Sequence, residues 1–252
     1  MNKQRLILIP IDLHNINRRS LETLVHLAQQ LDRGLLALLL EDLRLQQVAD
    51  LPFTTEITLS GARERSLLRD HLSIRHNRVI SSTRRLLNEL AQRNRVELSF
   101  EESAGQRLHC ALERGGSLDV FFPPRHQWLQ QGVAQASRTL YINRLGLLVT
   151  PDDQGQRVVD IAQTLLHSGH VGDIYLLTGA EPLPEQMRAL SHPGHRLSVQ
   201  TGFRSAPSSL AMLLRRSPYD LLLLPRNCLG QMADEVLDNA LETSGGQILL
   251  IS

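Results

Sequence analysis

Short apolar runs alternate with amphipathic segments along most of this chain of 252 residues. The first runs cover 5–12 and 35–40, and the segment between them, 20–31, repeats its apolar residues at intervals of three and four. A run that is apolar on both faces is typical of a parallel strand covered by helices, and the longer period is typical of a helix with one buried face. The alternation predicts an α/β fold built on parallel strands.

The same pattern predicts five strands in each half of the chain. We expect them at 5–12, 35–40, 96–100, 119–122 and 139–142, and again at 145–149, 174–177, 196–200, 220–224 and 247–251. The longest helix is expected at 66–94, and the polar stretch 43–61 is expected to be mostly loop. Because crossovers between parallel strands are right-handed, each set of five predicts a doubly wound sheet.

Two stretches of the chain share one design. An aspartate, an apolar strand, a proline and an arginine follow one another in both, and the offset is 101 residues from Asp119 to Asp220 and from Arg125 to Arg226. A self-match of this length indicates a duplicated domain and not a short solenoid repeat. We therefore expect a first domain at 1–143 and a second, shorter domain at 144–252.

The strand exits resemble those of a known family. The stretches 6–12, 105–108 and 118–122 are similar to a domain of the universal stress protein family, and the second half is similar to another such domain. The resemblance implies two tandem five-stranded parallel sheets of order 3-2-1-4-5, the adenine nucleotide alpha hydrolase-like fold. It also implies an intrachain pseudo-dimer that pairs through the fifth strands.

Many members of that family bind ATP through an acidic residue after the first strand and a glycine-rich loop after the fourth. Asp12 matches the acidic position in the first half, and Asp152 or Asp153 matches it in the second. The first glycine of the loop is replaced by Pro124 and Pro225, and proline has no N–H group to offer a phosphate. The resemblance therefore implies nucleotide-binding motifs that are degenerate in both halves.

Ligands of open parallel sheets bind just beyond the carboxyl ends of the strands. The candidate ligand-binding residues are accordingly those at the strand exits: Pro10, Asp12, Glu41, Pro124, Arg125, Asp152, Pro225, Arg226 and Gly230. Each arginine of this set could clamp an anion with its guanidinium group. The alternative is that it pairs with a nearby acid or backbone carbonyl and positions its loop.

Charge and composition narrow the classes of function. A formal net charge of +1 gives no field that would favour nucleic acid or a membrane surface. The stretch 65–95 nevertheless holds eight arginines against two acids, which is either a docking face for an acidic partner or nucleic acid, or a solvated helix face. The first apolar run is too short for a signal peptide or a membrane span.

Catalytic and metal-binding patterns are not found in the sequence. His71 and His76, like His192 and His195, lack the spacing of a helical zinc pair, and there is no Gly-x-Ser-x-Gly turn. The two cysteines lie one in each half, which argues against a disulfide framework and fits a cytoplasmic setting.

The sequence thus predicts a non-catalytic universal stress protein-like chain that acts in stress response through protein partners or a small, anionic ligand. We expect no metal and no cofactor in this case, and further homodimerisation is left open. The alternative is an ATP- or AMP-binding member of the family that uses an atypical site near Asp12 and Arg125.

Overall fold

The computed structural model describes residues 5–12, 18–41, 47–48, 51, 53–57, 61–62, 64–66, 69–124, 141–181 and 184–252. The strands of the first half are β1 (Leu6–Asp12), β2 (Gly34–Glu41), β3 (Thr55–Ile57), β4 (Glu64–Ser66), β5 (Leu98–Ala104) and β6 (Asp119–Phe122). Its helices are α1 (Arg18–Gln30), α3 (Arg69–Asn94) and α4 (Arg107–Gly115).

The second half repeats this alternation of strands and helices. Its strands are β7 (Ile142–Val149), β8 (Val171–Thr178), β9 (Leu197–Gln200), β10 (Leu221–Pro225) and β11 (Gln247–Ile251). Its helices are α5 (Asp153–His167), α6 (Pro184–Leu190), α7 (Pro207–Arg215), the short 3₁₀ helix η2 (Arg226–Leu229) and α8 (Asp234–Glu242).

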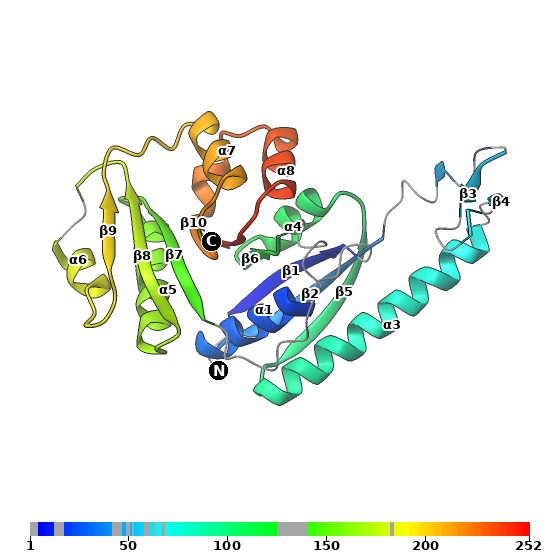
Figure 1. The fold of residues 1–252 in the computed structure, drawn as a ribbon, viewed down its shortest axis with the longest axis horizontal. Coiled ribbons are helices and arrows are strands. Elements are labelled where there is room, and N and C mark those ends of the chain that lie inside the picture. Colours follow the sequence, from blue (N-terminus) through cyan, green and yellow to red (C-terminus); the bar gives the residue numbers. More distant parts are fainter. Residues whose placement is uncertain are drawn as a thin grey trace.

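A single sheet of nine strands runs through both halves, in the order β5-β2-β1-β6-β11-β10-β7-β8-β9 (Figure 1). Neighbouring strands are parallel within each half. At the centre β6 and β11 are antiparallel, so the strands of the two halves run in opposite directions. The carboxyl ends of the first-half strands therefore lie at one edge of the sheet, and those of the second half lie at the opposite edge.

The expectation of two separate five-stranded sheets is wrong. The second half has the expected order 3-2-1-4-5, but its fifth strand, β11, pairs with β6, the fourth strand of the first half. Of the fifth strand expected at 139–142, residues 139 and 140 lie outside the described part of the chain, and Ile142 is the first residue of β7. The edge of β6 carries backbone groups that need partners, and β11 supplies them.

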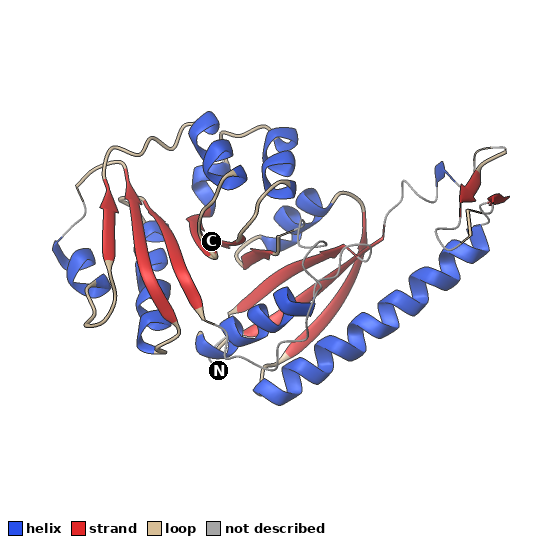
Figure 2. Ribbon diagram, in the orientation of Figure 1, coloured by secondary structure: helices blue, strands red, loops and turns tan. Residues whose placement is uncertain are grey.

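Helices cover both faces of this sheet (Figure 2). One buried cluster packs α1, α5 and part of α3 on one face, and the other packs α4, α7 and α8 on the opposite face. Successive strand residues belong to different clusters: Phe121 packs into the first, whereas Val120 and Phe122 pack into the second. Strands buried on both sides account for the unbroken apolar runs of the sequence.

Two prolines lie inside strands and not just beyond them. Pro10 lies within β1, which continues past it to Asp12 and pairs with β2 along its whole length. On its other side, β1 pairs with β6 only at Ile7 and Leu8. Pro225 likewise ends β10 opposite β11, after pairing with β7 has stopped at Leu223. Each proline is tolerated where one neighbouring strand has already ended.

The stretch 43–61 was expected to be mostly loop, but part of it forms a strand. It contains β3, which pairs with β4 in a separate two-stranded sheet. Figure 1 shows this pair of strands at the far end of α3, away from the nine-stranded sheet.

Candidate functional site

The carboxyl ends of β7 and β10 are adjacent because the two strands pair in parallel. Beyond β7, Asp152 forms the N-cap of α5: its Oδ1 accepts hydrogen bonds from the backbone N–H of Gly155 at 2.8 Å and from the hydroxyl of Thr150 at 2.7 Å. An aspartate that precedes a helix satisfies one of its unpaired N–H groups, which is the local reason for α5 to begin here.

Asn227 links this turn to the exit of β10. Its side-chain amide donates to Oδ2 of Asp152 at 2.5 Å, and its backbone N–H donates to Oε1 of Gln154 at 3.0 Å. Both carboxylate oxygens of Asp152 are thus bonded to the protein itself. The acidic residue at the position that the family resemblance singled out serves as a cap and as a bridge between two connections.

These hydrogen bonds change the acidity of Asp152. Partial burial raises the pKa of its carboxyl group, but the bonds from Gly155, Thr150 and Asn227 favour the ionised form and lower the pKa below its ordinary value overall. The carboxylate therefore stabilises the folded protein most strongly when it is ionised.

Replacing Asp152 with alanine is expected to lower the free energy of unfolding by about 1 kcal/mol near neutral pH, through loss of the cap. Because the folded-state pKa is depressed, this contribution is present above the unfolded-state value of about 4 and is lost as the pH falls through the folded-state value. Urea denaturation of both proteins across that range measures the effect. Asp153→Ala, at an exposed position one residue further on, is the control. If the loss in free energy of unfolding caused by Asp152→Ala does not change with pH, the role of the ionised Asp152 carboxylate as a helix cap is contradicted.

The connection after β10 is a tight turn and not an open loop. η2 starts at Arg226, directly after β10. The N–H groups of Gly230 and Met232 donate to the carbonyls of Asn227 and Leu229 at 3.2 and 2.9 Å. Gly230 itself is exposed and has ordinary helical dihedral angles. A phosphate loop needs N–H groups that point at the ligand, and these are bonded within the turn.

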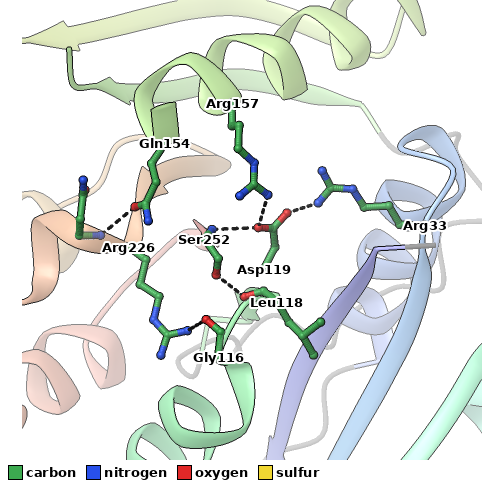
Figure 3. Close-up of polar contacts among 9 residues, drawn as sticks. Arg33, Gly116, Leu118, Asp119, Gln154, Arg157, Arg226 and Ser252 are labelled. Atoms are coloured by element: carbon green, nitrogen blue, oxygen red, sulfur yellow. Dashed lines mark hydrogen bonds and ion pairs between the residues drawn. The ribbon is translucent and has the colours of Figure 1, made fainter. Parts of the chain in front are cut away.

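Arg226 reaches across to the first half (Figure 3). Its Nη1 donates to the carbonyl of Gly116 at 2.8 Å and its Nη2 donates to the carbonyl of Leu112, both at the C-terminal end of α4. Burial lowers the pKa of Arg226. A cation at a helix C-terminus satisfies unpaired carbonyls and complements the helix dipole. Of the two roles considered for this residue, the structure shows the bond to backbone carbonyls.

Asp119 holds the two halves together at the start of β6 (Figure 3). The residue is 2% exposed, and its Oδ2 accepts a hydrogen bond from Arg33, which precedes β2. Its Oδ1 accepts from Arg157 of α5 at 3.2 Å and from the backbone N–H of Ser252 at 2.9 Å. The equivalent Asp220 is exposed and accepts the backbone N–H of Arg144 at 3.0 Å. The two stretches of similar sequence therefore differ in their contacts.

The arginines of this cluster were not among the residues that the sequence singled out. An aspartate in front of a wholly apolar strand was a signal that a buried carboxylate needs a partner. Nothing local identified Arg33 or Arg157 as that partner, because they lie 86 and 38 residues away along the chain.

The candidate residues of the first half that the structure describes follow strands whose carboxyl ends lie at the other edge of the sheet. Asp12 and Glu41 end the paired strands β1 and β2, and Pro124 is buried two residues beyond β6. The side chain of Asp12 and the whole of Arg125 lie outside the described residues. The ends of β1 and β2 thus lie side by side, and a ligand role for the candidate residues of this half stays a prediction.

Within the described ranges, no group of three or more histidine, cysteine, aspartate or glutamate residues could hold a metal ion. In the same ranges, none of the helices combines the length and the apolar character needed to cross a membrane.

This chain is similar to known proteins in structure, and the sequence comparisons found no match. No family model and no curated protein matches the sequence. Among solved structures, a universal stress protein from Archaeoglobus fulgidus DSM 4304 is similar, with a TM-score of 0.54, 10% sequence identity, and coverage of 98% of this chain and 96% of that chain. The chain therefore has a universal stress protein-like α/β fold, and the similarity extends over both halves.

Proposed function

We propose that this chain is a non-catalytic, two-half universal stress protein-like protein whose role in stress response is exerted through protein partners or a small ligand at a degenerate crevice. The observation that carries the proposal is the closed exit of β7 and β10. There Asp152, Gln154 and Asn227 bond to one another, and η2 stands where a phosphate loop would follow the fourth strand.

Two features of this exit speak against binding and hydrolysis of ATP in the second half. The cation that could have faced a phosphate, Arg226, is bonded to the carbonyls of α4. Hydrolysis also needs a base that is free to orient water, and both oxygens of Asp152 accept hydrogen bonds from the protein. A ligand of this half would have to displace several internal bonds before it gained any of its own.

The duplicated Pro-Arg stretches support the tandem origin of the two halves, although the sheet is shared. Cys110 and Cys228 are unpaired, which supports a location in the cytoplasm, where thiols stay reduced.

Thermal unfolding in the presence of ATP, ADP, AMP and inorganic phosphate tests the proposal. We expect no more than about 1 °C of stabilisation by any of them. A ligand at 100 times its Kd would stabilise the chain by about 2.7 kcal/mol, which is several degrees for a protein of this size. We also expect phosphate release from ATP to equal that of the buffer.

Stabilisation by micromolar ATP or AMP would overturn the proposal, because it would show that the chain binds a nucleotide. Two variants then locate the site: loss of the shift in Asp12→Ala with Arg125→Ala places the nucleotide in the first half. Loss of the shift in Asp152→Ala places it in the second.

A further inference from the structure

We draw no further inference here: the strongest candidate, the cluster of His167, His192 and His195 between the C-terminal end of α5 and the connection from α6 to β9, brings imidazole rings to centroid distances of 5.7 and 5.4 Å, but no group of three such side chains in the described part of the chain could hold a metal ion, and nothing in the structure shows another ligand for them.

Discussion

Replacing Asp119 with alanine is expected to lower the free energy of unfolding by about 3–5 kcal/mol, because it removes one member of a buried ion cluster and leaves charged partners without it. The Asp119 side chain is 1% exposed, and those of Arg33 and Arg157 are 11% and 24% exposed. Both guanidinium groups would lose the only carboxylate with which the structure pairs them in the described part of the chain. Urea denaturation followed by circular dichroism measures the change.

The duplicated motif offers a matched control for this prediction. Asp220 occupies the equivalent position before β10, but it is exposed and accepts a single backbone N–H of Arg144. Asp220→Ala should therefore cost about 1 kcal/mol, as expected for one solvent-exposed hydrogen bond. Equal losses at the two positions would show that the ion cluster between the halves contributes nothing beyond a local hydrogen bond.

The Asp119 cluster also predicts which part of the molecule is weakened. Its members are the residue before β2, the first residue of β6, a residue of α5 and the residue after β11, so the contacts cross the boundary between the halves. Hydrogen exchange of Asp119→Ala should increase in β6 and β11, where the halves pair, more than in β8. Uniform acceleration along the chain would mean that the cluster does not hold this junction in particular.

Gly155→Ala is expected to destabilise the protein by about 3 kcal/mol, at the upper end of typical costs for overpacking. A Cβ atom at this position would lie 1.9 Å from the carbonyl oxygen and 2.6 Å from the nitrogen of Thr150. Both are backbone atoms of the turn that leads to Asp152, so the turn itself must move. Differential scanning calorimetry and urea denaturation measure the loss.

The direction of this effect separates packing from helix propensity. Gly155 lies in the first turn of α5, where alanine by propensity alone would stabilise the helix by up to about 1 kcal/mol. Gly245→Ala is the control, because a Cβ there meets nothing within 4 Å. If Gly155→Ala is neutral or stabilising, the close approach of α5 to the end of β7 is absent in solution.

Much of the secondary structure followed from the sequence. The strands expected at 35–40 and 119–122 appear as β2 and β6, and the helix expected at 66–94 appears as α3. An unbroken apolar run is usually a strand that is buried on both faces. Apolar residues at intervals of three and four usually belong to a helix that is buried on one face. The repeat around Asp119 and Asp220 likewise placed both fourth strands correctly.

The roles of the site residues depended on distant partners. The sequence left two possibilities for Arg226, and the structure shows it on the carbonyls of α4, 110 and 114 residues away. Asp152 was selected as a ligand residue, but its oxygens are bonded to Thr150, Gly155 and Asn227. Composition and spacing cannot show which side chains bond to each other when they lie on loops that are far apart in the sequence.

The sequence by itself determined which segments are buried strands and helices, that the design occurs twice, and that proline stands where a phosphate loop would begin. Only the tertiary structure decided that β11 pairs with β6 and makes one sheet of nine strands. The physical reason is that side-chain patterns record which faces of a strand are buried. The choice of neighbour is made by backbone N–H and C=O groups, which every residue except proline carries alike.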